Sequence, residues 1–334
     1  MSAHRIHIAG TDVTFAAALG DNLLRAGLRA GLGLPYECNA GGCGSCKFEL
    51  VHGEVTQLWS EAPGLSAKDR QRGRRLACQC IAKSDCEIKI RPSDAFVARV
   101  LPHRFDATYL GCVAVTADIR EFRFQSAQPA RFAPGQYALV TLPDATQARA
   151  YSMSNQPNDE GVWAFMVRRV PGGQVSPQLF DALQPGSKVC IDGPLGFAHW
   201  REDSPRGVVC IAGGSGIAPV LSIANAVARS AAAVPLWLFY GGRTQADIPQ
   251  FGSWLHDSAR VQVHAALSAD TGEASAWKGP RGFIHEVVAQ SLPGEHADHE
   301  YYLAGPPPMI ETTVRMLIVE RKVPASQIHY DRFF

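Results

Sequence analysis

The stretch PYECNAGGCGSC occupies residues 35–46 and carries Cys38, Cys43 and Cys46, with four and then two residues between successive cysteines. A fourth cysteine, Cys78, follows after a long interval. Thiolates stabilise ferric iron, and three on one loop with a fourth from elsewhere can hold a [2Fe-2S] cluster. The intervening glycines permit positive φ and let backbone N–H groups approach the cluster sulfides. The loop therefore predicts an iron-sulfur site with Cys38, Cys43 and Cys46 as three ligands and a distal cysteine as the fourth.

Other metal sites fit the loop less well. Structural zinc motifs usually hold close cysteine pairs or add histidine, and the loop contains no histidine. A Rieske centre would replace two of the cysteines by histidines. Cys80 is an alternative fourth ligand, because alternation along a strand would place it on the same face as Cys78. The other cysteines lie among apolar residues, and we predict that they are core thiols: Cys86, Cys112, Cys190 and Cys210.

The residues around this loop predict a small β-grasp unit over residues 1–93. Alternating residues near 5–8 and 12–15 predict strands, the apolar run 23–30 predicts a helix, and residues 86–90 predict a closing strand. The same unit contains a basic run of Lys68, Arg70, Arg72, Arg74 and Arg75. Such a run is usually a solvated face, although it could steer an acidic partner toward the cluster.

The composition of the whole chain is that of a globular protein. Its 334 residues are 46% hydrophobic and 19% charged, with Lys+Arg 32 against Asp+Glu 31, which argues against a nucleic-acid partner. The length suggests two or three domains, and we expect three. The N-terminus lacks the apolar region of a secretory signal, so we expect a cytoplasmic location. The uncharged stretch 207–228 contains Gly213, Gly214, Gly216 and Pro219, which favour a strand, turn and helix over a membrane span.

A second unit, residues 97–200, follows a short linker near residues 92–94. Short strand-like runs separated by turn signals predict an antiparallel barrel: residues 111–116, 121–125, 136–142, 163–170 and 188–191. Arg149, Tyr151 and Ser152 lie on one extended segment, and Gly173 and Ser176 lie on a later loop. Taken alone, each segment could be a surface strand or an ordinary turn before a helix.

The third unit, residues 206–334, has the pattern of a parallel α/β domain. The apolar run 208–212 is followed by Gly213, Gly214 and Gly216 and then by apolar residues at helical spacing. This is the arrangement of a phosphate-binding turn between strand and helix. Two further apolar runs, residues 237–240 and 301–303, also lead into glycine, at the carboxyl ends where ligands bind open parallel sheets.

Together, these segments resemble the ferredoxin-NADP reductase superfamily, which has Arg-x-Tyr-Ser and Gly-x-x-Ser motifs in its flavin site. The order of the three units is similar to that of the reductase components of bacterial multicomponent oxygenases. Residues 35–46, 58–65 and 331–334 in particular resemble the toluene monooxygenase reductases. The resemblance implies a β-grasp [2Fe-2S] ferredoxin domain, an antiparallel β-barrel FAD domain and a parallel-sheet α/β NAD domain.

The resemblance also implies roles for particular residues. Cys78 is the fourth cluster ligand. Tyr151 covers the isoalloxazine, Ser152 lies near flavin N5, and Phe334 covers the face that the nicotinamide must reach, so these three are the expected catalytic residues. The flavin phosphates are expected to contact Arg149, Gly173, Val175 and Ser176. The dinucleotide is expected to contact Gly213, Gly214, Gly216, Gly242, Arg243, Gly305 and Pro306.

Many relatives have cysteine at the position of Ala304, which weakens any role for a side chain there in hydride transfer. NADH is favoured over NADPH, because no basic cluster follows Gly242 and Asp247 would oppose a 2′-phosphate. FMN in place of FAD is an open alternative.

The implied activity is that of an NADH-dependent ferredoxin reductase. It would pass electrons from NADH through FAD and the [2Fe-2S] cluster to a Rieske-type ferredoxin, and from there to the diiron hydroxylase of a toluene-type aromatic hydrocarbon monooxygenase. Alternatives are a reductase that serves a Rieske aromatic-ring dioxygenase or that reduces the oxygenase component directly. An alternative of a different class is a non-catalytic redox sensor. No nucleic-acid or membrane partner is expected.

Overall fold

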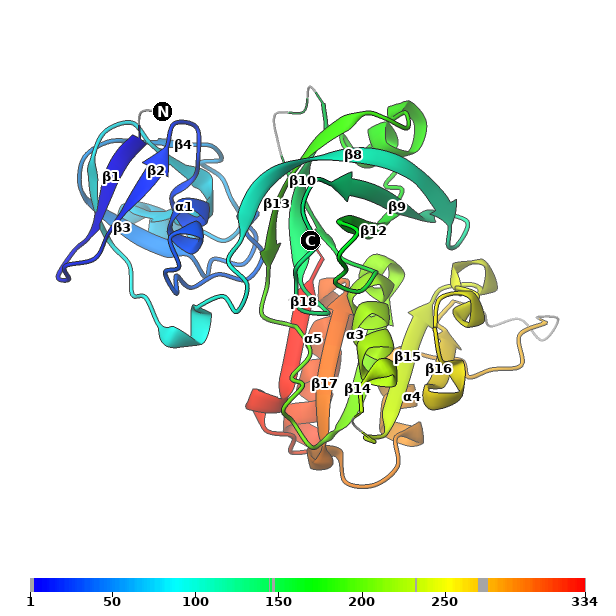
Figure 1. Ribbon diagram of the computed structural model, residues 1–334. Coiled ribbons are helices and arrows are strands. Elements are labelled where there is room, and N and C mark those ends of the chain that lie inside the picture. Colours follow the sequence, from blue (N-terminus) through cyan, green and yellow to red (C-terminus); the bar gives the residue numbers. More distant parts are fainter. Residues whose placement is uncertain (1–2, 144, 146–147, 232, 270–275, 334) are drawn as a thin grey trace. The chain divides into compact units, whose positions relative to one another are not determined.

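The computed structural model describes residues 3–143, 145, 148–231, 233–269 and 276–333 (Figure 1). The chain forms two compact units. Unit 1 comprises Met1–His103 together with Gly193–Phe197, and unit 2 comprises Arg104–Asp192 together with Ala198–Phe334. The boundaries expected for three domains, 1–93, 97–200 and 206–334, stay a prediction.

Unit 1 is built on a five-stranded sheet of order β2-β1-β7-β3-β5. Its strands are β1 (Ala3–Ile8), β2 (Thr14–Ala18), β3 (Lys47–His52), β5 (Arg74–Leu76) and β7 (Cys86–Lys89). β1 and β7 pair in parallel, whereas the other pairs are antiparallel, as expected of a β-grasp unit. A separate two-stranded sheet joins β4 (Val55–Gln57) to β6 (Cys80–Ala82), and a single 3₁₀ turn, Ala77–Gln79, precedes β6.

Two short helices complete unit 1. α1 (Leu23–Arg29) begins at Asn22, whose side chain accepts a hydrogen bond from the backbone of Arg25, and it buries leucines against the sheet. α2 (Ala67–Gln71) begins at Ser66 with a capping box to Asp69. The second stretch of unit 1, Gly193–Phe197, contacts the first stretch in two ways. Gly196 N–H donates a hydrogen bond to Tyr36 Oη over 2.9 Å, and the ring of Phe197 packs against the ring of Tyr36.

The first part of unit 2 is a six-stranded antiparallel barrel of order β11-β10-β13-β8-β9-β12. An isolated bridge between Met153 and Phe165 links the segment after β11 to β12, so the barrel is nearly closed. Its strands are β8 (His103–Ala114), β9 (Ile119–Ser126), β10 (Tyr137–Thr141), β11 (Arg149–Ser152), β12 (Val162–Arg168) and β13 (Lys188–Leu195). Aromatic rings of β9 and β12 fill its interior.

Two sequence predictions for the barrel were wrong, the start of β8 and the burial of two cysteines. The strand starts well before residue 111, because Gly111 (φ 145°) lies at a bulge inside the strand rather than at its beginning. Cys112 is exposed and Cys190 is half-buried, so neither is the predicted core thiol, whereas Cys86 and Cys210 are buried. The apolar neighbours of Cys112 misled the prediction because this end of β8 faces solvent, and Val113 is exposed beside it.

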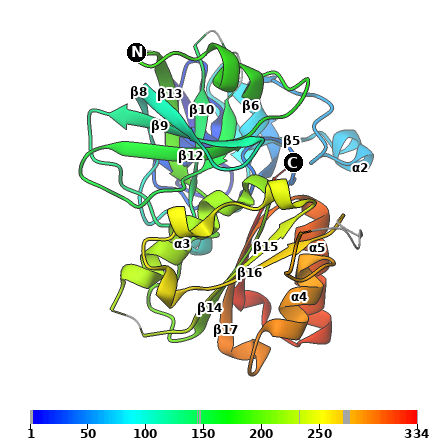
Figure 2. The same ribbon diagram turned by 90° about the vertical axis from the view of Figure 1, so that its right-hand side faces the viewer.

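The second part of unit 2 is a five-stranded, wholly parallel sheet of order β16-β15-β14-β17-β18. Its strands are β14 (Gly207–Gly213), β15 (Leu236–Gly242), β16 (Gln262–Leu267), β17 (His299–Gly305) and β18 (Ile328–Arg332). α3 (Ile217–Arg229) covers one face, and α4 (Ile284–Ser291) and α5 (Pro307–Arg315) cover the other (Figure 2).

Short turns of 3₁₀ and π-helix connect these elements. The 3₁₀ turns are Asp94–Phe96, Gly214–Gly216, Gln245–Asp247, Phe251–Ser253, Ser258–Arg260, His296–Asp298 and Ala325–Gln327, and the π-helical turns are Gln178–Ala182 and Met316–Glu320. Residues 207–228 form β14, a turn and α3, as the sequence predicted. No helix among the described residues is both long enough and apolar enough to cross a bilayer.

Candidate cluster, flavin and dinucleotide sites

The four predicted cluster ligands lie together in unit 1 as two pairs. The Sγ atoms of Cys38 and Cys43 are 3.3 Å apart, and the hydrogen bond between the two thiols lowers the pKa of Cys43 to about 4. Cys46 pairs with Cys78, and this hydrogen bond together with burial raises the pKa of Cys46 well above its ordinary value. Each pair could serve one iron of a binuclear cluster. Among the described residues, no three ligand side chains converge as they would around a single metal ion.

The surroundings of the first pair fit an anionic, sulfur-rich group. The backbone N–H groups of Ala40 and Cys43 donate to Cys38 Sγ over 3.4 and 3.3 Å, and Ser45 N–H donates to Cys43 Sγ over 3.4 Å. Asn39 has left-handed backbone (φ 53°) and is only 4% exposed. Neither polar atom of its side chain has a hydrogen-bond partner among the described residues. A buried amide without a partner costs about 1–3 kcal/mol, so this loop suits a ligand with acceptor atoms beside Asn39.

The choice between Cys78 and Cys80 depends on local backbone structure. Cys78 lies in the 3₁₀ turn Ala77–Gln79 rather than in a strand, so the alternation expected between the two cysteines does not hold. Asn22 Nδ2 donates to the carbonyl of Cys78 over 3.0 Å and fixes this turn beside Cys46. Cys80 begins β6, and burial raises the pKa of its thiol to about 12. We propose Cys78 as the fourth ligand because it is the one paired with Cys46.

The two cysteine pairs differ in their access to solvent. Cys46 and Cys78 are 2% and 1% exposed, whereas Cys38 and Cys43 are half-buried, with exposed residues beside them at Ala40 and Ser45. A cluster held by these four thiols would therefore be most accessible to solvent at the first pair.

The predicted flavin residues lie on β11, at an edge of the barrel. In the register between β10 and β11, Val140 pairs with Arg149, Ala138 with Tyr151 and Tyr137 with Ser152. Tyr151 is half-buried, its ring lies 6.5 Å from that of Phe165, and burial raises its pKa to about 12. Ser152 is buried. A guanidinium, an aromatic ring and a hydroxyl on one strand form a donor set that fits a flavin nucleotide.

The second predicted flavin segment is a tight loop before a short helix. The hydroxyl of Ser176 accepts a hydrogen bond from Val170 N–H over 2.9 Å, so it closes the loop. A Cβ added at Gly173 would lie 3.1 Å from the carbonyl oxygen of Val170, which shows how closely the backbone turns. Val175 is buried in the barrel core and anchors the segment. The backbone N–H groups of this turn are suited to a phosphate, and the roles of these residues stay proposals.

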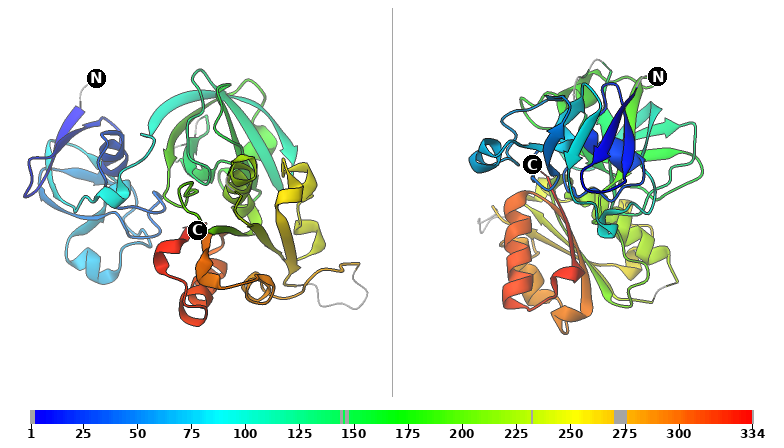
Figure 3. Two further views of the ribbon diagram at one scale, coloured as in Figure 1. Left: turned by 60° about the horizontal axis from the view of Figure 1, so that its bottom comes forward. Right: turned by 90° about the vertical axis from the view of Figure 1, so that its left-hand side faces the viewer.

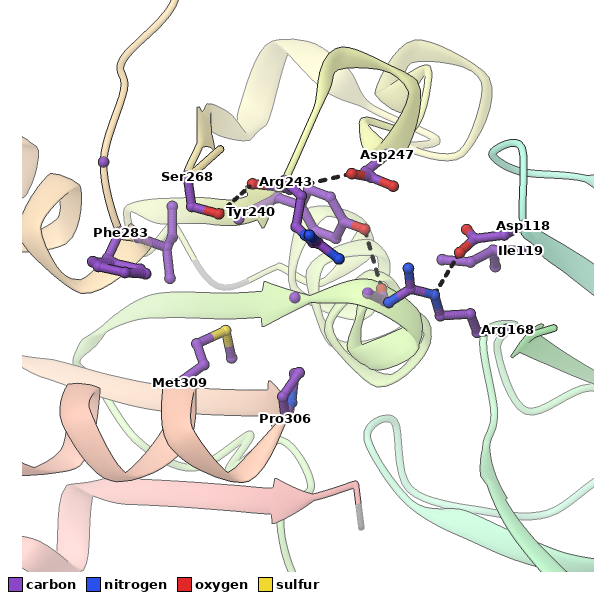
Figure 4. A pocket seen from close by; sticks show the side chains of 16 residues that line it. Asp118, Ile119, Arg168, Tyr240, Arg243, Asp247, Ser268, Phe283, Pro306 and Met309 are labelled. Atoms are coloured by element: carbon purple, nitrogen blue, oxygen red, sulfur yellow. Dashed lines mark hydrogen bonds and ion pairs between the residues drawn. The ribbon is translucent and has the colours of Figure 1, made fainter. Parts of the chain in front are cut away.

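A pocket opens at the carboxyl ends of the parallel strands (Figure 4). Of the predicted dinucleotide residues, Gly213, Gly214, Gly242, Arg243 and Pro306 line it. A side chain at Gly213 would fill part of this space, because a Cβ there would lie 2.9 Å from Met309 Sδ, which lines the pocket. A Cβ at Gly242 would lie 2.8 Å from Ile248 Cδ1, so this glycine too is closely packed. The pocket is therefore a cradle that depends on glycine, as a dinucleotide site requires.

Two predicted glycines do not line this pocket. A Cβ at Gly216 would lie only 2.0 Å from the carbonyl oxygen of Ala304, and Gly305 (φ 148°) packs against the backbone of Gly213. Both permit close approach between the turn after β14 and the end of β17. Phe334, the predicted flavin cover, lies outside the described residues, and its neighbour Phe333 packs against the core under α3.

Sequence reasoning missed the residues that complete the pocket, above all Arg168 and Asp118. Arg168 Nε lies 2.5 Å from Asp118 Oδ2, and a Cβ at Gly214 would lie 3.6 Å from Arg168 Nη1, so the guanidinium stands over the turn after β14. Tyr240 Oη donates to the carbonyl of Gly214 over 3.2 Å. No spacing in the sequence connects Asp118 to Arg168, and an arginine at the end of a strand would ordinarily be interpreted as a surface residue.

The charge of the pocket is set at its rim. Asp247 Oδ2 accepts hydrogen bonds from the backbone N–H groups of Arg243 and Thr244 over 3.0 and 2.8 Å, which fixes a carboxylate just after β15. The Arg243 side chain is exposed. The pocket thus presents Arg168 near the phosphate-binding turn and a carboxylate where the adenosine ribose is expected.

Comparisons with known proteins assign the three parts of the chain. Residues 6–83 match the 2Fe-2S iron-sulfur cluster binding domain, residues 111–200 the oxidoreductase FAD-binding domain, and residues 210–315 the oxidoreductase NAD-binding domain. The chain is 44% identical to ferredoxin–NAD(P)⁺ reductase CarAd of Metapseudomonas resinovorans, over 94% of this chain and 95% of that one. It is 33% identical to the xylene/toluene monooxygenase electron transfer component XylA of Pseudomonas putida, over 98% and 93%.

Solved structures show the same architecture. The ferredoxin reductase in carbazole 1,9a-dioxygenase is 39% identical, with a TM-score of 0.92 over 100% of this chain and 99% of that one. The Amycolatopsis cytochrome P450 reductase GcoB is 31% identical, with a TM-score of 0.83 over 99% and 98%. The chain therefore belongs to the ferredoxin–NAD(P)⁺ reductases, the FAD-, NAD- and [2Fe-2S]-binding oxidoreductases that serve as reductase components of multicomponent oxygenase systems.

Proposed function

We propose that this reductase takes electrons from NADH and delivers them to a Rieske-type ferredoxin, which in turn serves the diiron hydroxylase of a toluene-type aromatic hydrocarbon monooxygenase. When bound, FAD accepts a hydride from NADH, and the [2Fe-2S] cluster carries one electron at a time. The observation that carries the proposal is a dinucleotide pocket and a four-cysteine site with a solvent-reachable pair in one chain.

Different residues of the chain would hold the dinucleotide, the flavin and the cluster. Arg168 and the glycines after β14 would hold the dinucleotide phosphates, and Asp247 favours NADH because its carboxylate would repel a 2′-phosphate. Arg149 and the loop before Ser176 would hold the flavin phosphates, while Tyr151 and Ser152 would border its reactive part. The cysteine pairs and the surrounding N–H groups would hold the cluster.

Reduction potentials support a Rieske-type acceptor. Plant-type clusters lie near −400 mV and Rieske centres at about −150 mV or above. That drop of about 250 mV, at about 59 mV per decade for one electron, favours forward transfer by about four orders of magnitude.

A second candidate is the reductase of a Rieske aromatic-ring dioxygenase. The 44% identity to CarAd, and the likeness to a structure titled for carbazole 1,9a-dioxygenase, favour it. Reduction of the oxygenase component without a ferredoxin is a further alternative.

Anaerobic stopped-flow measurements with separately purified acceptors test the proposal. Reductase loaded with FAD and cluster and supplied with NADH should reduce a Rieske-type ferredoxin at a rate that supports turnover. Faster direct reduction of a diiron hydroxylase would contradict the ferredoxin step. Reconstituted systems then separate the two oxygenases, since a toluene-type monooxygenase gives a phenol and a ring dioxygenase gives a cis-diol.

A further inference from the structure

The positive charge of unit 1 is concentrated in one short segment. Residues 1–103 contain 13 Lys and Arg against 10 Asp and Glu. Residues 66–75 alone hold five of those basic residues and only one acidic residue, so the remainder of the unit has eight basic and nine acidic residues. The segment spans α2 and β5 and leads directly to the turn that carries Cys78.

The single carboxylate of this segment points inward. Asp69 is buried, caps the helix through Ser66, and pairs with Lys47 over 2.8 Å and with Arg74 over 3.2 Å. These contacts hold the pKa of Asp69 well below its usual range, with the hydrogen bond from Lys47 as the largest cause. The Asp69 carboxylate is buried and is paired with Lys47 and Arg74. It therefore does little to neutralise the positive charges of Lys68 and Arg72, which are exposed.

An exposed aromatic residue lies beside this charged segment. Trp59 is 45% exposed and its neighbour Leu58 is 53% exposed, although large apolar residues are usually buried. Arg70 Nη2 lies 3.8 Å from the carboxylate of Glu61, so the loop with Trp59 and helix α2 form one surface. We define this docking surface by Leu58, Trp59, Lys68, Arg70 and Arg72. Figures 2 and 3 show α2, in light blue, standing clear of the sheet of its unit.

The docking surface is directly connected to the cluster loop. Gly64 N–H, on the loop that follows Trp59, donates to the carbonyl of Gly41 over 2.9 Å. A Cβ at Gly64 would lie 2.6 Å from Gly44 N, so the two loops are in close contact between the cysteines. Leu58 N–H donates to the carbonyl of Gln79 over 2.8 Å, next to Cys78. A protein bound here would contact the loop that is hydrogen-bonded to both ligand-bearing segments.

We propose that the docking surface binds the acidic face of the electron-accepting ferredoxin, with Trp59 as the apolar anchor and the outer basic residues as the steering charge. The inference rests on the proposed function and specifies where its partner binds. Tryptophan and arginine are the residues most enriched among interface hot spots. A local field of one sign, on a chain of net charge +1, raises the association rate of an oppositely charged partner without attracting polyanions in general.

The test uses full-length reductase loaded with FAD and cluster, NADH, and a purified Rieske-type ferredoxin with an acidic surface. The triple variant Lys68→Glu/Arg70→Glu/Arg72→Glu should lower the second-order rate of ferredoxin reduction at least tenfold at low salt and should flatten its salt dependence. Trp59→Ala should lower the rate about tenfold at every salt concentration, and Trp59→Phe should restore most of it. In all of these variants NADH should still bleach the reductase's own cluster at the wild-type rate.

The matched controls are exposed residues of the same unit outside the docking surface. Lys83→Glu/Lys89→Glu, at the end of β6 and on β7, reverses similar charge, and Leu19→Ala removes a similarly exposed apolar side chain. Both should behave as wild type. The single variant Arg72→Gln, with an intermediate loss and a reduced salt slope, keeps the test valid if the triple variant does not fold.

Three outcomes would overturn the inference. If the docking-surface variants match the wild type in rate and salt dependence, the ferredoxin does not bind at this surface, and the proposed function is unaffected. Losses that occur with a diiron hydroxylase but not with the ferredoxin would reassign the partner. Wild-type reductase whose cluster is reduced by NADH but which fails to reduce the ferredoxin would remove the proposed function, and the docking inference with it.

Discussion

Asn39 directly follows Cys38 in the predicted cluster loop; it is buried, and its side chain makes no hydrogen bond among the described residues. Hydrogen bonds toward a cluster stabilise its more negative, reduced form and so raise its potential. Asn39→Gly keeps the left-handed backbone (φ 53°) but removes the amide, and we expect the cluster potential to fall by up to about 59 mV, a tenfold change in the one-electron equilibrium. Redox titration followed by EPR measures it.

The charged counterpart provides the control. Asn39→Asp has the same shape and tolerates the same φ, but it adds a negative charge beside an anionic group and should lower the potential further than glycine does. Equal potentials in the wild type and both variants would show that the Asn39 amide does not reach the cluster.

Arg168 stands over the turn after β14, which we propose binds the dinucleotide phosphates. Charge-assisted hydrogen bonds contribute about 1.5–3 kcal/mol, so Arg168→Ala should raise KM for NADH about tenfold or more, with a smaller change in kcat. Steady-state reduction of ferricyanide measures both constants. Arg131→Ala removes an exposed arginine that is paired with Asp159 outside the pocket, and it should leave KM unchanged. Equal KM values in the two variants would contradict a phosphate contact at Arg168.

Asp247 fixes a negative charge at the end of β15. Asp247→Asn keeps an acceptor oxygen for the backbone N–H groups but removes the charge that would repel a 2′-phosphate. The kcat/KM for NADPH should rise several-fold, while that for NADH should change little. Unchanged NADPH kinetics would locate the cofactor preference elsewhere in the pocket.

At the scale of elements, the fit of α3 against β17 depends on Gly216. A Cβ there would lie 2.0 Å from a backbone oxygen that cannot move away without distorting β17. Gly216→Ala should therefore destabilise unit 2 by about 1–3 kcal/mol or more, as overpacked sites do. Gly252→Ala is the matched control, because nothing lies within 4 Å of its added Cβ and its φ is not left-handed. Thermal unfolding followed by circular dichroism compares the two, and similar melting temperatures would refute the close approach.

The elements that the sequence predicted best have strong local patterns. The apolar spacing of residues 217–228 predicted α3, and the runs before glycine predicted β14, β15 and β17. The strands β3, β4, β5, β16 and β18 were not predicted, because they are short or lack clear alternation and are defined by their partners in the sheets. The glycine within β8 was interpreted as a strand start, although a glycine can also mark a bulge inside a strand, and the pairing of β8 with β9 distinguishes the two.

The candidate sites show the same division. The cysteine spacing within residues 38–46 is local, so it predicted three of the thiols that converge. Cys78 was predicted over Cys80 from the resemblance, and the 3₁₀ turn that carries Cys78 supports this choice, which stays a proposal. The contact between Asp118 and Arg168 joins residues far apart in the sequence, and it depends on the register between β9 and β12, in which Arg168 pairs with Ile119. The orphaned amide of Asn39 is likewise a property of packing, because sequence gives no measure of burial for one asparagine in a glycine-rich loop.

For the whole molecule, acid stability should reflect the buried histidines at the amino ends of the parallel strands. Burial lowers the pKa of His299, whose Nδ1 has no hydrogen-bond partner among the described residues. The unfolded chain therefore binds the proton first as the pH falls. The contribution of neutral His299 to stability is complete above about pH 6.5 and is lost below it, toward the lowered pKa of the folded state.

Urea unfolding at pH 7.5 and pH 5.5 measures this effect. His299→Phe keeps an aromatic ring against Trp237 without a titrating group, so the free energy of unfolding should fall less between the two pH values than in wild type. His52→Phe changes an exposed histidine and should leave the pH dependence as it is. A wild-type loss on acidification that persists in His299→Phe would assign the acid sensitivity to other groups.

The discontinuity of unit 1 limits how reductases of this family can be recombined. Its hydrogen bond from Gly196 to Tyr36, and the ring contacts of Phe197 with Tyr36 and Phe96, come from a stretch nearly a hundred residues beyond the rest of the unit. A chimera joined at a single point after His103 would exchange residues 1–103 of the iron-sulfur module but would keep the recipient's own residues 193–197. Transplanting 193–197 along with the module, as a second graft, should yield hybrids that mature with their iron intact.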